Sequence, residues 1–145
     1  MIRSPVFTSR AAAPLTHITP LSKPYRVSRD SILPAGGPWL EHLVEIPLNT
    51  DTDVRQPYLH GQPISRKEIL DRHYEMVRST GRSSCVALGV HDVYLAENPQ
   101  RPPVLAEMAA SLDHVRTIRQ RGDVPVCFAT ASEIADRVRT ETGLW

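Results

Sequence analysis

The stretch SSCVALGVHDV, residues 83–93, decides how the rest of the chain is interpreted. Its apolar run from Cys85 to Val90 is short and bounded by polar residues, which predicts a buried strand. Strands that are buried on both faces belong to parallel sheets covered by helices, and the chemistry of such sheets lies beyond the carboxyl ends of the strands. His91 and Asp92 follow the predicted strand at that point. We therefore expect a functional site next to His91.

Three helices are predicted around this strand. Ser65 and Glu68 have the spacing of a capping box at a helix start, and Gly81 is a suitable left-handed stop. Thr130 and Glu133 repeat the capping-box spacing and open a helix that runs through Arg139. A further helix is predicted over residues 104–121, with a buried stripe formed by Leu105, Met108, Leu112, Val115 and Ile118.

Two more apolar runs predict strands. HLVEIPL, residues 42–48, is expected to lie at a sheet edge or to end at Pro47, because proline has no backbone donor. VPVCFA, residues 124–129, precedes the last helix. Strands that alternate with helices indicate parallel βα units.

The predicted fold class is therefore α/β, as a partial (β/α) barrel of about three parallel strands alternating with three helices. A full barrel takes roughly 250 residues, and this chain has 145. We divide the chain into a Pro-rich irregular N-terminal segment, residues 1–42, and the partial barrel, residues 43–145.

Composition excludes several classes of function. The formal net charge of +1 gives no global field for binding nucleic acid or a membrane surface. No apolar stretch reaches the ~20 residues that span a bilayer, and no signal peptide is evident, so we expect a cytoplasmic protein. Cys85 and Cys127 lie in apolar runs, which favours two buried, reduced thiols over a disulfide.

Several short motifs occur in a set order along the chain. RSPVF begins at Arg3, PYR at Pro24 and LVEIPL at Leu43, and the strand that ends before His91 and the segment VCFATASEIA from Val126 follow. From about Arg3 to Val138 this order resembles the C-terminal half of the polysaccharide deacetylase superfamily. Those proteins are metal-dependent carbohydrate esterases and amidases on a distorted (β/α) barrel.

The resemblance implies hydrolysis of the C–N amide bond of an N-acetylated carbohydrate or a related amide. In the family a divalent metal, usually zinc, polarises the carbonyl and lowers the pKa of bound water. On this resemblance His91 is the general acid and Arg3 pairs with the catalytic carboxylate. Leu88 and Val90 would help to wall the acyl pocket.

One part of the family pattern is missing. The family holds its metal with an aspartate and an H-x-x-x-H pair upstream of the Arg-x-Pro segment, whereas the six histidines of this chain contain no i, i+4 pair. We therefore expect no metal bound by this chain, no hydrolysis by the chain alone, and an N-terminal half that could assemble in trans.

Other interpretations stay open. The chain could be a non-catalytic α/β module that binds a partner or small ligand through the loops after Leu48, His91 and Ala129. His91 could be a strand-end histidine bonded to a loop, and Asp51 and Asp53 could be turn residues. Zinc binding would instead require a site built from Asp51, Asp53, His60 and His91. His73 is expected to be a satisfied core histidine, whereas His114 is assigned no role.

Overall fold

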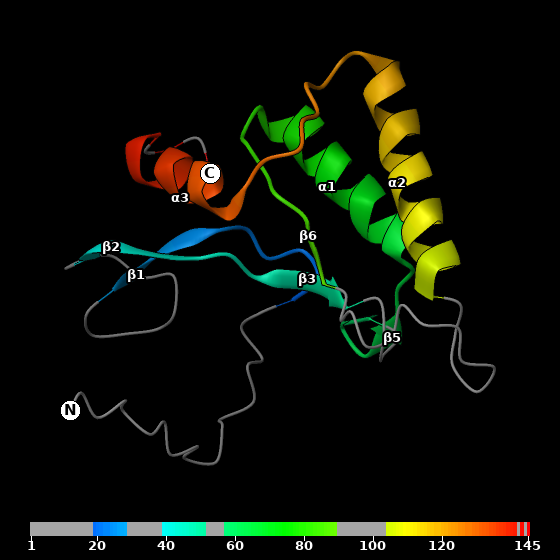
Figure 1. Ribbon diagram of the computed structural model, residues 1–145, viewed down its shortest axis with the longest axis horizontal. Coiled ribbons are helices and arrows are strands. Elements are labelled where there is room, and N and C mark those ends of the chain that lie inside the picture. Colours follow the sequence, from blue (N-terminus) through cyan, green and yellow to red (C-terminus); the bar gives the residue numbers. More distant parts are fainter. Residues whose placement is uncertain (1–18, 29–38, 52–56, 90–103, 142, 144) are drawn as a thin grey trace.

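A computed structural model describes residues 19–28, 39–51, 57–89, 104–141, 143 and 145 of the chain. These residues form a mixed α/β structure with three helices and several short strands (Figure 1). Their strands make three two-stranded sheets and no closed barrel. The helical part of the prediction is confirmed, and the parallel sheet is much smaller than expected.

The three helices begin and end close to the predicted residues. They are α1 (Arg66–Thr80), α2 (Val104–Arg121) and α3 (Ala131–Thr140). Gly81 ends α1 in the left-handed conformation with φ 66°, as its sequence position predicted. These ends follow from local chemistry, which is why the sequence alone located them.

The two expected capping boxes differ. Thr130 and Glu133 form the complete box: the Thr130 hydroxyl accepts from the Glu133 N–H, and the Glu133 carboxylate accepts from the Thr130 N–H. At α1, Ser65 accepts from the Glu68 N–H, while the Glu68 carboxylate accepts from Arg72 one turn later. An arginine at i+4 therefore competes for the second half of the α1 box.

The run HLVEIPL is divided between two sheets. Strand β2 (Trp39–Glu45) pairs antiparallel with β1 (Tyr25–Ser28), which lies in the segment expected to be irregular. Strand β3 (Leu48–Asp51) belongs to a different sheet. The division falls at Pro47, whose side chain is fully buried, so the predicted end at this proline is confirmed.

One parallel pair is present in the described residues. Strand β3 pairs with β6 (Ala87–Gly89), and α1 lies between them in the sequence. The strands β4 (Tyr58–Leu59) and β5 (Gln62–Pro63) form a small hairpin in the same connection. Leu48 is 52% exposed, so this pair is not buried on both faces as the sequence suggested.

The expected strand at residues 124–129 is wrong. These residues have no strand pairing, although Val124 is buried and Val126 is half-buried. Their side chains cover the pair α1 and α2, while Cys127 and Phe128 are exposed. Val124 and Val126 thus pack against the two helices, and this packing accounts for the alternating apolar pattern that had predicted a strand.

Helices α1 and α2 lie side by side and run in the same direction, opposite to β6 (Figure 1). Their shared core contains Leu70, Tyr74, Ile118 and Val124. Leu105 and Leu112 were expected in this core, but both are exposed because the face of α2 that turns inward is centred on Ser111 and Ile118. A second cluster, formed by Leu59, Ile64 and Ile69, joins the β4–β5 hairpin to α1.

None of the helices in the described part of the chain has the length and apolar character that crossing a membrane requires.

Candidate functional site

The carboxyl edge of the β3–β6 pair is the place where a parallel sheet would hold a site. Thr50 lies opposite Leu88 and Asp51 opposite Gly89, so both strands end at the same level. The packing there is close: a Cβ on Gly89 would lie 2.9 Å from Leu48 Cδ1. Val90 and His91 continue the chain from Gly89.

Asn49 connects this sheet to the N-terminal part of the described chain. Its Oδ1 accepts from the Ala87 N–H at 2.7 Å, across the two strands. Its Nδ2 donates to the carbonyls of Pro20 at 3.0 Å and Ser22 at 2.9 Å. Asn49 is buried, and these three bonds use both donors and one acceptor of its amide. The side chain therefore acts as a bridge between β3, β6 and residues 20–22.

His73 completes this buried polar cluster. Its Nε2 lies 3.0 Å from the Pro20 carbonyl, which can only accept, so Nε2 carries the proton. Its Nδ1 then accepts from the Ser84 hydroxyl at 2.6 Å. Burial lowers the pKa of His73, the Pro20 carbonyl opposes that shift, and the charge of Lys23 lowers it further. His73 is thus a neutral, satisfied core histidine, and this prediction is confirmed.

A serine that donates to a histidine is also the contact found in nucleophilic catalysis. In this chain His73 is 3% exposed, and its lowered pKa makes it a weaker base. The contact between His73 and Ser84 is therefore best described as a tie between α1 and the segment before β6.

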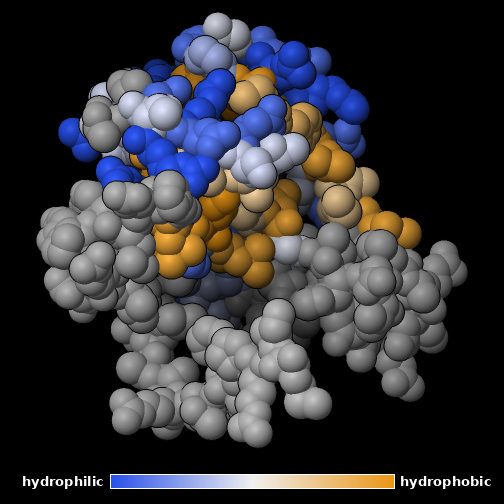
Figure 2. All heavy atoms as spheres, turned by 60° about the vertical axis from the view of Figure 1, so that its left-hand side comes forward, coloured by the Kyte–Doolittle hydropathy of each residue, from blue (hydrophilic) through white to orange (hydrophobic). Residues whose placement is uncertain are grey.

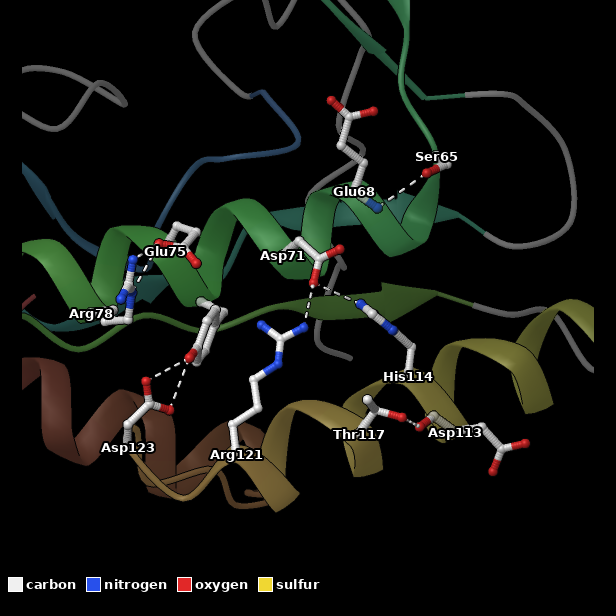
Figure 3. A network of polar contacts seen from close by, with 11 residues as sticks. Ser65, Glu68, Asp71, Glu75, Arg78, Asp113, His114, Thr117, Arg121 and Asp123 are labelled. Atoms are coloured by element: carbon white, nitrogen blue, oxygen red, sulfur yellow. Dashed lines mark hydrogen bonds and ion pairs between the residues drawn. The ribbon is translucent and has the colours of Figure 1, made fainter.

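A second polar network joins α1 to α2 and to the residues that follow α2 (Figure 3). Asp71 accepts from His114 Nε2 at 2.8 Å and lies 3.7 Å from a guanidinium nitrogen of Arg121. The Tyr74 hydroxyl lies 2.6 and 2.9 Å from the two carboxylate oxygens of Asp123. The Arg121 guanidinium stacks 4.7 Å from the centre of the Tyr74 ring. These contacts hold the helix pair together from its solvent side.

The hydrogen bond between Tyr74 and Asp123 shifts the pKa values of the two groups in opposite directions. The hydrogen bond to Asp123 raises the pKa of the Tyr74 phenol. The same bond lowers the pKa of the Asp123 carboxyl, because the hydroxyl donates to its ionised form. We interpret this pair as structural: it holds the segment after α2 to α1, and the ring of Tyr74 also belongs to the core.

A hollow of about 350 Å³ lies beside α1, lined by Leu21, Asp71, Arg72 and Glu75. Its charged groups are already engaged: Asp71 with His114, Arg72 with Glu68, and Glu75 with Arg78. The hollow therefore offers no convergent set of unpaired polar groups for a ligand.

Metal ligands do not come together in the described part of the chain. No group of three His, Cys, Asp or Glu side chains there could hold a metal ion. Asp53 and His91, which a zinc site in this chain would require, lie outside that part. We derive no chemical step through a metal.

The predicted site residues fall mostly outside the described residues. Arg3, Val90 and His91 are outside them, as are Asp53 and Asp92. Leu88 is described: it is a half-buried residue of β6, opposite Thr50. The roles assigned to these residues therefore stay predictions.

The remaining candidates belong to separate elements of the described part of the chain. His60 is exposed in the turn between β4 and β5, with φ 52°. The His114 side chain, assigned no role from the sequence, is 10% exposed and pairs with Asp71. The two cysteines are free, with Cys85 half-buried and Cys127 exposed, so the expectation of two buried thiols is wrong for Cys127.

The sequence analysis missed Asn49 and Ser84 as members of a buried cluster. A polar residue two positions after the proline break at Pro47 was the only local sign for Asn49. Its partners Pro20 and Ala87 are far away in the sequence, so periodicity and capping signals carry no information about them.

Comparisons of the chain with protein-family models, with curated proteins and with solved structures found no match. The resemblance to polysaccharide deacetylases therefore rests on the order of the sequence motifs alone.

Proposed function

We propose that this chain takes part in hydrolysis of the amide bond of an N-acetylated carbohydrate, with the carboxyl edge of β3 and β6 as its substrate-binding edge. The observation that carries the proposal is the parallel pairing of these two strands, with Asp51 opposite Gly89 at their common end. The residue that would act as general acid, His91, follows Gly89 by two positions.

Each residue has a defined part in this proposal. His91 would donate a proton to the leaving amine nitrogen, as a general acid does. Leu88 and Val90 would line the acyl pocket, and Arg3 would orient the catalytic carboxylate. That carboxylate and the metal ligands would come from another segment, because the sequence contains no H-x-x-x-H pair.

Binding and hydrolysis should be measured together on the full chain. We would titrate an N-acetylated chitooligosaccharide into the isotope-labelled protein, follow backbone amide signals by NMR, and assay acetate release with and without added zinc. We expect the signals of residues 48–51 and 87–93 to shift, with no acetate released. His91→Ala should weaken binding several-fold.

His60→Asn is the matched control, because His60 is an exposed histidine at φ 52°, a conformation that asparagine tolerates. It should bind the sugar like the wild type. Unchanged signals at the β3–β6 edge, or equal binding by His91→Ala and wild type, would contradict the proposal. Zinc-dependent acetate release that His91→Ala abolishes would keep the proposed activity and place the metal ligands in this chain, starting with Asp51, Asp53 and His60.

A second candidate function is that of a non-catalytic α/β module that associates with a partner. The observation that favours it is a set of exposed large apolar side chains: Leu43, Leu48, Tyr58, Leu105, Leu112 and Phe128. Figure 2 shows apolar side chains gathered below a largely hydrophilic upper surface. Exposed apolar patches on a small domain commonly mark interaction sites.

Phe128 tests this second candidate because it is the most exposed of these residues, at 75%. Sedimentation of the wild type should show concentration-dependent association, and Phe128→Ser should weaken it. Asp136→Ser, on the exposed surface of α3, is the control and should change nothing. A monomer at every concentration would argue against association through this surface with a second copy.

A further inference from the structure

Lys23 connects the N-terminal part of the described chain to the segment between α1 and β6. Its ammonium group donates to the Ser83 carbonyl at 3.2 Å, and Ser83 follows directly after Arg82. The backbone before Lys23 is held as well, because the Asn49 side chain donates to the Ser22 carbonyl at 2.9 Å. Hydrogen bonds therefore hold both the backbone next to Lys23 and its amine, and Arg82 is one residue away from the acceptor of that amine.

Two cationic residues lie at this contact without a carboxylate partner. Among the residues that the structure describes, no ion pair includes Lys23 or Arg82. Lys23 is half-buried, whereas Arg82 is exposed. Burial lowers the pKa of the Lys23 ammonium group, and the charge of Arg82 lowers it further. A lysine in such a place loses its proton more readily than a hydrated one, and the free amine is a nucleophile.

The chain contains one other lysine, Lys67, which provides a comparison within the same molecule. Lys67 is exposed in the first turn of α1 and is followed by Glu68. The residue before it, Arg66, is paired with Glu107. Lys67 therefore has neither the partial burial of Lys23 nor an unpaired cationic neighbour in the sequence.

We propose that Lys23 is an acyl-acceptor site that reacts with acyl phosphates, which are small anions that neighbouring cations attract. The free amine attacks the carbonyl carbon of the donor, the bond between that carbon and the phosphate oxygen breaks, and phosphate leaves with the electron pair. The nitrogen gives up one proton, which passes through water to the phosphate. The product is a neutral amide whose N–H is still able to donate to the Ser83 carbonyl, so the charge is lost while the donor stays.

This inference goes beyond the proposed deacetylation and does not depend on it. It involves neither His91 nor the carboxyl edge of β3 and β6, because Ser83 lies before the start of β6 at Ala87.

Acetyl phosphate is the probe for this proposal. We would incubate the folded full chain with it, stop the reaction while most chains carry no acetyl group, and measure the acetylation of each lysine by mass spectrometry of proteolytic peptides. We expect Lys23 to react roughly threefold faster than Lys67. The neutral donor N-hydroxysuccinimidyl acetate, used in parallel, should give a smaller ratio of the two rates, because neighbouring cations do not attract it.

Three variants make the result specific, and circular dichroism would check that each is folded. Arg82→Gln removes the neighbouring cation and should roughly halve the ratio of the two rates with acetyl phosphate. Arg119→Gln, which changes an exposed arginine of α2, is the matched control and should keep the wild-type ratio. Lys23→Arg keeps the charge without the amine, and should leave the acetylation rate of Lys67 unchanged.

Three results would each overturn the proposal. The first is a reaction at Lys67 that is as fast as, or faster than, the reaction at Lys23. The second is an unchanged ratio of rates in Arg82→Gln. The third is a ratio that is no larger with acetyl phosphate than with the neutral donor.

Discussion

The pair α1–α2 and the pair β3–β6 are held together by different kinds of contact. The helices share an apolar core and several polar contacts on the solvent side, among them the ion pair of Arg66 with Glu107 and the hydrogen bond of Asp71 with His114. The strands share a short ladder with a register shift after Leu48, and Asn49 adds a buried bond across it. Loss of one contact should therefore matter little in the helix pair and much in the strand pair.

Asn49→Ala should give the largest effect on stability. The change removes the acceptor of the Ala87 N–H and a donor to each of the Pro20 and Ser22 carbonyls, of which Pro20 keeps His73 Nε2, and a buried polar group that loses its partner costs roughly 1–3 kcal/mol. We expect a loss of about 3 kcal/mol in the free energy of unfolding, measured by urea titration with circular dichroism.

Gln120→Ala is the matched control for Asn49→Ala, because it removes an exposed amide from α2. It should change the free energy of unfolding by less than about 0.5 kcal/mol. Equal effects of the two substitutions would mean that β3 and β6 do not depend on the Asn49 bridge.

His73 should make the strand side of the molecule sensitive to acid. Its pKa is lowered in the folded state, so the unfolded chain binds a proton near the ordinary value of 6.5 before the folded chain does. Stability from this group is thus complete above pH ~6.5 and falls as the pH decreases toward the folded pKa. The slope for one proton is at most about 1.4 kcal/mol per pH unit.

The His73 prediction is tested by comparing how the free energy of unfolding changes with pH in the wild type and in two variants. His73→Gln keeps a donor for the Pro20 carbonyl and removes the titration, so the loss of stability between pH 7 and pH 5 should be smaller than in the wild type. His60→Gln, which changes an exposed histidine, should keep the wild-type slope. Parallel slopes for all three proteins would show that His73 does not control the acid response.

The helix caps allow a finer comparison within the helical part. Ser65→Ala and Thr130→Ala each remove an N-cap acceptor, which costs about 1 kcal/mol. Thr130→Ala should cost more, because Thr130 belongs to a complete box whereas the Glu68 carboxylate bonds to Arg72. Ser132→Ala, at an exposed position of α3, is the control and should cost nothing in urea unfolding.

The same comparison explains which parts of the fold were predictable. Ser65, Thr130 and Gly81 act through neighbours within four residues, so their patterns located both ends of α1 and the start of α3. The fate of residues 124–129 was decided by Tyr74 and Ile118, which are distant in the sequence. An alternating apolar run buries one side equally well against a strand or a helix pair.

The candidate site was less predictable for a related reason. His73 was correctly expected in the core because it falls on the apolar face of a helix, which is local information. Its partners Ser84 and Pro20 and its neighbour Asn49 come from three other segments and have no common motif. Sequence order suggested His91, Arg3, Leu88 and Val90, of which Leu88 alone lies within the described residues.

Asp113→Asn should give the smallest effect and is the reference for the contacts of the helix pair, because its partner Arg116 lies on the same helix, α2. Asp113 and Arg116 form an ion pair whose side chains are 69% and 73% exposed, so water screens it. We expect a change of less than about 0.5 kcal/mol in urea unfolding, and a still smaller one at high salt. Asp71→Asn should cost more, because Asp71 bonds to a His114 side chain that is only 10% exposed. If Asp113→Asn costs as much as Asp71→Asn, the contact between Asp71 and His114 contributes no more than an exposed pair within one helix, and the helix pair depends on the core of Leu70, Tyr74 and Ile118.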